Sequence, residues 1–229
     1  PEGGFYSAED ADSLSLENPK EKREGAFYAW SEKEISNILD KNEAGIFNYY
    51  FGVKAQGNVS VDPSGDFQGK NILYIAHSLE ETARHFGQTP AETEKNISAS
   101  QAKLFTARSS RPRPHLDDKI LVDWNGLMIS AFAFGSRVLN EPRYYQAAEN
   151  SARFILKNLL RKDVRLWHRF RDDEAAIEAM LDDYAFFIYG LIDLYEANFN
   201  PIYLKEARKL TKTMLQLFWD NKDGGFFFV

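Results

Sequence analysis

Carboxylates, an indole and an amide occur close together between residues 117 and 125. Asp117-Asp118-Lys119 is followed by Asp123-Trp124-Asn125 at a predicted helix start. An aromatic face can stack on the C–H surface of a sugar ring, and carboxylates accept hydrogen bonds from paired hydroxyls. The group therefore predicts a sugar site. An Asp before a helix is also a preferred N-cap, worth about 1 kcal/mol, and a Trp also packs in cores, so both alternatives stay open for Asp123 and Trp124.

A second acidic pair, Asp182-Asp183, stands before Tyr184 at the start of a later predicted helix. One of these carboxylates can cap that helix, which leaves the other without an evident structural role. Asp123 and Asp183 occupy nearly the same register of two sequence repeats, so a closed array of helices would bring them to the same end. Paired carboxylates can act as general acid and general base in glycoside chemistry. We predict that both are catalytic.

His168, in the sequence Trp167-His168-Arg169, is the third catalytic candidate. Its imidazole titrates near neutral pH and can carry a proton during catalysis. A structural or solvent-exposed histidine is the alternative. His115, in a loop rich in Arg and Pro, is expected in solvent, and His77 and His85 lie on ordinary amphipathic helices.

Asp10 and Asp12 are spaced by one residue in a predicted loop. Two carboxylates in such a loop can bind calcium or substrate hydroxyls, although the other ligands of an EF-hand are missing. A turn or cap role is the alternative.

Composition removes several classes of function. The formal net charge is -6 and no long Lys/Arg block occurs, which argues against nucleic acid or an anionic membrane as a partner. The absence of cysteine excludes thiolate chemistry and Cys-ligated zinc. The four histidines do not form a metal-binding spacing, so we expect neither a protein-held metal nor another cofactor. No apolar run approaches the roughly 20 residues needed to span a bilayer, so the expected compartment is the cytoplasm.

The second half predicts two copies of one helical hairpin. Apolar residues recur with helical spacing after Trp124 and again after Tyr184, and a proline follows each stripe and can begin a return helix. These prolines, Pro142 and Pro201, are 59 residues apart. A short strand is expected after each hairpin, over residues 164–170 and 224–228. The predicted helices cover residues 124–139, 142–159, 184–198 and 201–218.

The first half is less regular. Ser31 and Thr89 each begin an S/T-x-x-E capping box, in which two side chains satisfy free backbone N–H groups at a helix start. Loops are expected over residues 7–25, 52–69 and 109–119, where Gly, Pro, Ser and Asp are frequent. Long loops of this kind often carry function. Helices are predicted over residues 32–39, 44–51, 79–86 and 90–107.

Both ends of the chain predict a piece of a longer array. The opening Gly3-Gly4-Phe5-Tyr6 matches the closing Gly224-Gly225-Phe226-Phe227, so the first residues are expected to end an earlier hairpin. We therefore expect one fragment of a larger helical domain, with an irregular part over residues 1–119 and two repeats over residues 120–229.

Six motifs in this order resemble the YyaL and spermatogenesis-associated protein 20 type of thioredoxin-domain-containing protein. They extend over nearly the whole chain. The motifs are Gly-Gly-Phe-Tyr-Ser-Ala-Glu-Asp-Ala-Asp-Ser (3–13), Glu-Gly-Ala-Phe-Tyr-Ala-Trp (24–30), Arg-Pro-His-Leu-Asp-Asp-Lys (113–119), Trp-Asn-Gly-Leu-Met-Ile (124–129), Leu-Asp-Asp-Tyr-Ala (181–185), and Phe-Trp-Asp with Gly-Gly-Phe-Phe (218–227).

This resemblance implies an N-terminal thioredoxin-like domain that is absent from the chain, followed by a toroid similar to six-hairpin glycosidases and N-acylglucosamine 2-epimerases. The fold class is then all-α, a partial (α/α) toroid of helical hairpins with short β connections. Besides Asp123 and Asp183, the positions that match the motifs are predicted to bind substrate: Trp30, Asp10, Asp12, His115, Asp118, Lys119, Trp124, Asn125, Asp182 and Tyr184.

Two functions are compatible with the sequence. The first is a glycosidase-like or sugar-epimerase-like toroid that acts on or binds a sugar through paired carboxylates and the aromatic surfaces of Trp30, Trp124 and Tyr184. The second is a non-catalytic scaffold that holds a partner or regulates the thioredoxin-like domain of the same polypeptide, because helical repeats form extended binding surfaces. The oligomeric state is left open.

Overall fold

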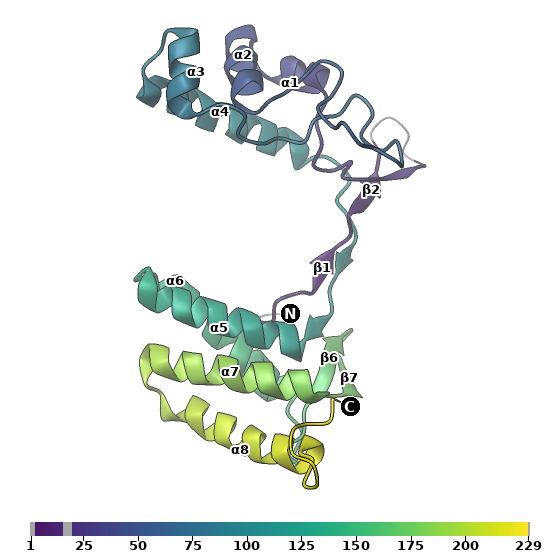
Figure 1. Ribbon diagram of the computed structural model, residues 1–229, viewed down its shortest axis with the longest axis vertical. Coiled ribbons are helices and arrows are strands. Elements are labelled where there is room, and N and C mark those ends of the chain that lie inside the picture. Colours follow the sequence, from purple (N-terminus) through teal and green to yellow (C-terminus); the bar gives the residue numbers. More distant parts are fainter. Residues whose placement is uncertain (1–2, 16–19, 229) are drawn as a thin grey trace. The chain divides into compact units, whose positions relative to one another are not determined.

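The computed structural model of the chain describes residues 3–15 and 20–228, and it contains two compact units (Figure 1). The hairpin unit comprises residues 3–8 and 116–228, and the insert unit comprises residues 9–115. Residues 1–2, 16–19 and 229 lie outside the described residues, and the second of these ranges falls within the predicted loop over residues 7–25. Strands β1 (Ala8–Glu9) and β4 (Leu116–Asp117) lie where the chain passes between the units.

Two helical hairpins form the hairpin unit, as the periodicity predicts (Figure 1). Pro142 and Pro201 each begin a return helix, where the missing N–H of proline costs nothing. The predicted all-α class, with hairpins joined by short strands, is confirmed. The helices are α5 (Val122–Val138), α6 (Pro142–Asn158), α7 (Leu181–Asn198) and α8 (Pro201–Phe218).

A three-stranded antiparallel sheet has the order β5-β6-β7, with β5 before the first hairpin in sequence and β6 and β7 between the two hairpins. Strand β6 (Trp167–Arg171) falls within three residues of the predicted strand, whereas its neighbours β5 (Ile120–Leu121) and β7 (Glu174–Glu178) were not predicted. Phe170 of β6 packs edge-on against Phe154 of α6, with ring centroids 5.1 Å apart. His168 lies on the same face of β6, since side chains alternate along a strand.

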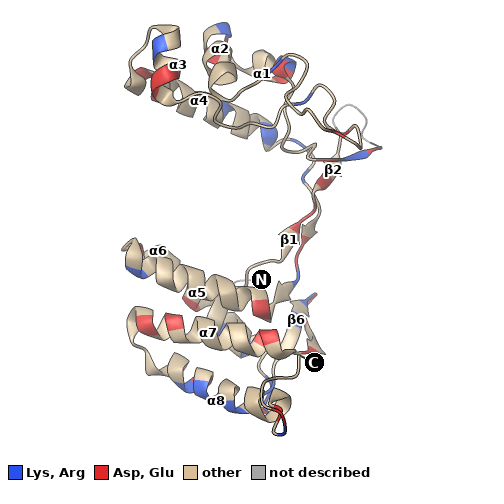
Figure 2. Cartoon of the chain, in the orientation of Figure 1, with Lys and Arg blue, Asp and Glu red and all other residues tan. Residues whose placement is uncertain are grey.

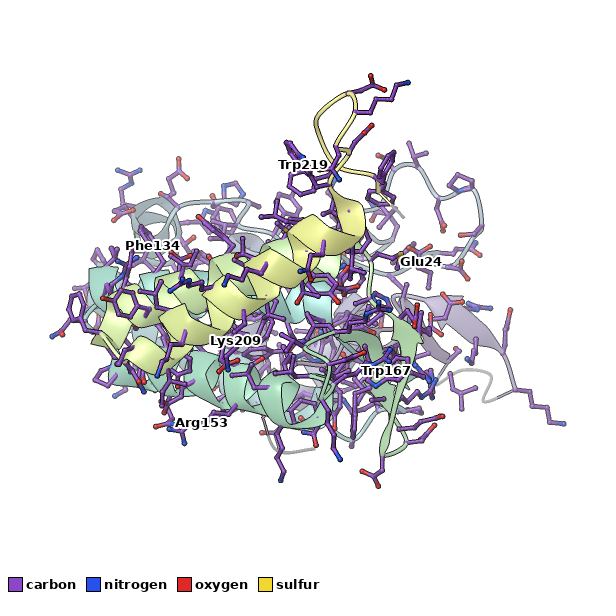
Figure 3. All side chains as sticks on the ribbon, turned by 90° about the horizontal axis from the view of Figure 1, so that it is seen from below. Glu24, Phe134, Arg153, Trp167, Lys209 and Trp219 are labelled. Atoms are coloured by element: carbon purple, nitrogen blue, oxygen red, sulfur yellow. The ribbon has the colours of Figure 1, made fainter. Side chains whose placement is uncertain are left out.

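The two repeats end in the same way. After α6 an isolated bridge joins Leu160 to Leu166, and after α8 another joins Trp219 to Phe226. The aromatic rings of the second bridge lie edge to face at 5.2 Å, and Trp219 stands at the base of the last loop in Figure 3. The prediction of a strand over residues 224–228 is therefore wrong in extent, because only one pair of residues bridges and no second strand extends it.

Helices α5 and α7 approach so closely that no side chain fits between them at two points. A Cβ atom on Gly126 would lie 2.4 Å from the carbonyl carbon of Phe186, and one on Gly190 would lie 2.5 Å from the carbonyl oxygen of Gly126. Such distances are well inside van der Waals contact. Around this contact lies one apolar core that includes Ile129, Phe187 and other fully buried side chains of all four helices.

One buried carboxylate joins α6 to α8. Glu149 is 8% exposed and accepts hydrogen bonds from the hydroxyls of Tyr145 and Tyr203, each at 2.7 Å, while Arg153 pairs with it at 3.1 Å. Burial alone would raise the pKa of Glu149, but the two phenols and the arginine outweigh burial and lower it. The carboxylate is therefore charged in the folded chain.

The insert unit contains four helices and two short strands. The capping boxes at Ser31 and Thr89 are confirmed, and Asp40 and Ser78 form two more. The predicted loop over residues 7–25 is partly wrong, because two of its segments pair as an antiparallel ladder. The elements are β2 (Asp12–Leu14), β3 (Lys22–Glu24), α1 (Glu32–Ile38), α2 (Lys41–Tyr50), α3 (Leu79–Phe86) and α4 (Pro90–Arg108).

Charges of both signs are distributed over the helices, with acidic groups on α7 and basic groups on α8 in Figure 2. Lys205, Arg208, Lys209 and Lys212 supply the basic groups of α8. Among the described residues, no helix combines the length and apolar character that crossing a bilayer requires.

We expect Gly126→Ala to destabilise the hairpin unit by about 1–3 kcal/mol, because the new methyl group meets the backbone of α7. Gly135→Ala on the same helix is the matched control. Its Cβ would touch only Tyr144, at an ordinary 3.6 Å, so better helix propensity should stabilise it by up to about 1 kcal/mol. Urea denaturation of both variants measures the effect, and equal stabilities would contradict the close contact.

Removal of one phenol from the Glu149 cluster should also be measurable. Tyr203→Phe leaves the carboxylate short of a hydrogen bond and should cost about 1–2 kcal/mol of unfolding free energy at neutral pH. Because the pKa of Glu149 is lowered on folding, its contribution is present above the unfolded value near 4.5 and is lost as the pH falls through the folded value. The cost of Tyr203→Phe should therefore shrink in acid, whereas Tyr144→Phe, outside the cluster, should cost little at any pH.

Candidate functional site

Asp123, His168 and Asp183 come together in the hairpin unit. Asp183 is the third residue of α7, and its carboxylate accepts the backbone N–H of Met180 at 2.8 Å and that of Asp123 at 3.1 Å. Nδ1 of His168 lies 2.9 and 3.0 Å from the two oxygens of the same carboxylate. The start of α5, the start of α7 and strand β6 are thereby joined at one buried group.

Asp183 is only 1% exposed, so its carboxylate has no free surface for a ligand. Its oxygens accept hydrogen bonds from two backbone N–H groups, and in the bond to His168 we place the hydrogen on Nδ1. Nε2 of His168 is then the nitrogen that can exchange a proton with a substrate. The carboxylate of Asp183 is thus enclosed and hydrogen-bonded to His168, and the catalytic role of Asp123 and Asp183 stays a prediction.

Asp123 is the second residue of α5, because the helix begins at Val122 and its N-cap is Leu121. The N-cap alternative for Asp123 is thus excluded. Its carboxylate accepts the backbone N–H of Trp124 at 2.8 Å and remains partly exposed. Of the two carboxylates, Asp123 is the one that a ligand can reach.

The electrostatics of the three groups favour proton exchange. The hydrogen bond to Asp183 raises the pKa of His168, against the effect of burial, and the charges of Asp183 and Asp123 raise it further. Burial raises the pKa of Asp123, and the nearby charge of Asp183 adds to this, while the Trp124 N–H and His168 oppose it. Both pKa values are therefore raised, which favours the protonated carboxyl of Asp123 and the imidazolium of His168, so each group can hold a proton.

The same three side chains each offer one ligand atom within 4.8 Å of the others, so they are also the group that could hold a metal ion. Two carboxylates and one imidazole suit a hard or borderline divalent cation. Such an ion would replace the His168 N–H as the partner of Asp183, whereas the proton bound at Nδ1 already fits the hydrogen-bond geometry. The arrangement fits acid–base chemistry without further adjustment.

Trp124 is 50% exposed, which excludes the alternative that it packs in the core. It lines a cavity of about 530 Å³ together with residues of the first segment of the chain and of α5. The sequence did not predict a binding role for this first segment, Phe5-Tyr6-Ser7, although the segment belongs to the first family motif. The apolar lining residues are Phe5, Tyr6, Leu121, Trp124, Leu127 and Met128.

Three predicted substrate-binding residues are buried and bound to the protein itself. Asn125 is 2% exposed and holds the backbone of Phe5 from both sides, at 2.8 and 3.0 Å. Tyr184 is 1% exposed, and its hydroxyl accepts the N–H of Leu166 at 3.0 Å. The polar atoms of both side chains are hydrogen-bonded within the protein, and their contact with a ligand stays a prediction.

Trp30 is the third buried residue, at 3% exposure in the core of the insert unit. The guanidinium of Arg111 lies 3.9 Å from its ring centroid and donates 2.8 Å hydrogen bonds to the carbonyls of Phe27 and Ala29. Trp30 is therefore a packing residue with a cation–π partner and offers no open face for sugar stacking.

The remaining predicted residues of the hairpin unit are more exposed. Asp118 pairs with Arg171 at 2.9 Å, and Lys119 pairs with Asp117 at 3.1 Å, so both lie in ion pairs at the edge of the sheet. Asp182 is partly exposed beside the buried Asp183.

Asp10, Asp12 and His115 lie in the insert unit. The side chain of Asp10 accepts the backbone N–H of Asp12 at 3.2 Å, which fits the turn role given above as the alternative for these two residues. The Asp10 carboxylate also lies 3.8 Å from the ammonium group of Lys22. Asp12 belongs to β2, and His115 is exposed. These three residues belong to the insert unit, whereas Asp123, His168 and Asp183 belong to the hairpin unit.

Comparison with known proteins finds homologues over nearly the whole chain. Spermatogenesis-associated protein 20 of Homo sapiens is 38% identical over 247 residues, which cover 98% of this chain and 31% of that protein. An uncharacterized protein of Caenorhabditis elegans is 39% identical over 241 residues, covering 99% of this chain and 33% of that protein. The chain thus spans about a third of the length of the curated relatives it matches. No family model matches it.

The solved structures with some likeness are more distant. Cellobiose 2-epimerase from Spirochaeta thermophila shares 17% identity with a TM-score of 0.44 over 48% of this chain and 28% of that chain. The GH76 α-mannanase of Bacteroides thetaiotaomicron shares 13% identity with a TM-score of 0.46 over 85% of this chain and 60% of that chain. The predicted resemblance of the sequence is confirmed by its homology to spermatogenesis-associated protein 20.

Asp183→Asn should lower the pKa of His168, because the neutral amide no longer favours the imidazolium. The raised pKa of His168 means that its pairing stabilises the fold below the unfolded value near 6.5 and loses this effect as the pH rises through the folded value. NMR titration of the imidazole and urea denaturation across this pH range would measure both changes. Asp182→Asn, one residue earlier, is the control, and an equal shift in that variant would contradict the specific pairing.

Proposed function

We propose that the hairpin unit carries an acid–base site that acts on a sugar or a closely related polyhydroxylated molecule. The observation that carries this proposal is the imidazole of His168, held at Nδ1 by the buried Asp183 and placed beside the accessible carboxylate of Asp123. The chain is homologous to about a third of spermatogenesis-associated protein 20. The proposal therefore concerns the region that this chain covers.

Each of the three residues has a distinct task in the proposed chemistry. His168 accepts a proton at Nε2 when neutral, and Asp183 stabilises the resulting imidazolium. Asp123, whose pKa is raised chiefly by burial, donates a proton from its protonated form or accepts one from its charged form. Two proton carriers at one place suit either glycoside hydrolysis, with one activating water and the other protonating the leaving oxygen, or epimerisation, with proton removal and return at one carbon.

The sugar assignment is supported by Trp124. Its indole is half exposed, and its backbone N–H donates to the carboxylate of Asp123. An aromatic face next to a carboxylate can stack on the C–H surface of a pyranose while the carboxylate accepts from its hydroxyls. The cytoplasmic location and the attached thioredoxin-like domain, both expected from the sequence, are part of the same proposal.

A second candidate is an interaction scaffold, and one observation favours it. Large apolar side chains remain exposed near the end of α5, namely Phe134 at 57%, Val138 at 64% and Leu139 at 65%. Exposed apolar groups that lie together often mark a protein contact. Capture of a stable partner, with no sugar-dependent change in melting temperature, would favour this candidate over the acid–base site.

Asp123→Asn and His168→Gln should each lower turnover at least about a hundredfold, because each removes one proton carrier. A thermal-shift screen of the full chain against sugars, amino sugars and sugar phosphates first identifies the responsive ligand, which stabilises by about 2.7 kcal/mol at a hundredfold excess over its Kd.

Glu196→Gln is the control, since it changes an exposed acidic residue of α7 that pairs with Arg137 and not with the site. Unchanged turnover of every responsive sugar by Asp123→Asn and His168→Gln would refute the assignment.

A further inference from the structure

We infer that the substrate of this site is a sugar conjugate with an apolar substituent, and that the cavity beside Trp124 binds that substituent. The inference rests on the proposed function, and it narrows the substrate from sugars in general to glycosides that carry an aryl or alkyl group.

The cavity is large enough for such a group and has the right chemistry. Its volume is about 530 Å³, within the usual range for small-molecule pockets. Its side chains include three aromatic rings, from Phe5, Tyr6 and Trp124, and no charged group. The lining also includes Ser7 and Asn125, whose side chains are already hydrogen-bonded within the protein. An apolar group against the aromatic and aliphatic walls therefore gains more from burial than an additional hydroxylated group would.

The wall of the cavity is fixed by specific contacts before a ligand arrives. Asn125 donates to the carbonyl of Phe5 and accepts its N–H, and the hydroxyl of Ser151 donates to the same amide oxygen at 3.0 Å. Ser7 donates to the carbonyl of Asp117 at 3.2 Å. The ring of Phe5 stacks on Phe132 with centroids 5.3 Å apart. A preformed wall lowers the entropy cost of binding.

Trp124 connects the cavity to the acid–base site. Its side chain lines the cavity, while its backbone N–H binds the carboxylate of Asp123. Leu121 and Trp124, which both line the cavity, stand on either side of Asp123 along the chain. We therefore expect one ligand to place a sugar ring at Asp123 and an attached apolar group in the cavity. The chemistry of the two neighbouring regions, one polar and titratable and one apolar, matches the two halves of a glycoside.

The test compares methyl and phenyl glycosides of the same sugar by calorimetric titration of the full chain, for glucose, mannose, galactose and N-acetylglucosamine. The phenyl glycoside should bind at least about tenfold more tightly, because the ring is buried against the cavity walls. Leu127→Gln and Met128→Gln should each reduce this ratio toward one. Both side chains are more than a third exposed, at 45% and 38%, so a polar amide is tolerated in the fold.

Val138→Gln is the matched control, since it changes an exposed apolar residue of the same helix outside the cavity lining and should preserve the ratio. If methyl glycosides bind and their turnover depends on Asp123, but phenyl glycosides gain nothing, the inference is overturned while the proposed function stands. The inference also fails if the phenyl advantage survives Leu127→Gln and Met128→Gln. If no glycoside binds at all, both the proposed function and the inference are overturned.

Discussion

The buried carboxylate of Asp183 is the group on which the candidate site depends. It accepts hydrogen bonds from Met180 at the start of α7, from Asp123 at the start of α5 and from His168 on β6. A charge without solvent is stable only when its oxygens are paired, so these bonds are needed for folding as well as for geometry. The hydrogen bond that compensates the burial of Asp183 also fixes the orientation of His168. In the proposed site, the same contact therefore serves both the stability of the fold and the position of the proton carrier.

The separation between the two helices that present the carboxylates is set by glycine. Because Gly126 and Gly190 allow the backbones of α5 and α7 to touch, the N–H of Asp123 comes within 3.1 Å of Asp183. A larger residue at either glycine would move the two helix starts apart and weaken this bond. Backbone packing deep in the unit thus determines a distance in the site, and the apolar core around Ile129 and Phe187 holds that packing.

Local signals in the sequence predicted most of the helices, whereas contacts between distant residues decided the rest. Pro142 and Pro201 mark helix starts by their own covalent geometry, and the apolar stripes beside them repeat within each helix. Strand β7 was missed because it forms only by pairing with β6. The shared register of Asp123 and Asp183 predicted that they lie at the same end of the array, and the N–H of Asp123 binds Asp183. The position of His168 beside Asp183 was not predicted, because it depends on the pairing of β6 in the folded chain. The burial of Asn125 and Tyr184 could not be predicted, because their partners lie 120 and 18 residues away.

The hydrogen bonds between Asn125 and Phe5 have a consequence for the order in which the chain folds. They join residues 120 positions apart, and the whole insert unit lies between them in sequence. Closing so long a loop costs more chain entropy than forming a helical hairpin, whose contacts are local. The hairpins α5–α6 and α7–α8 can therefore form first, and the segment with Phe5 joins them later. A newly made chain would contain its titratable site before the apolar cavity beside it was closed.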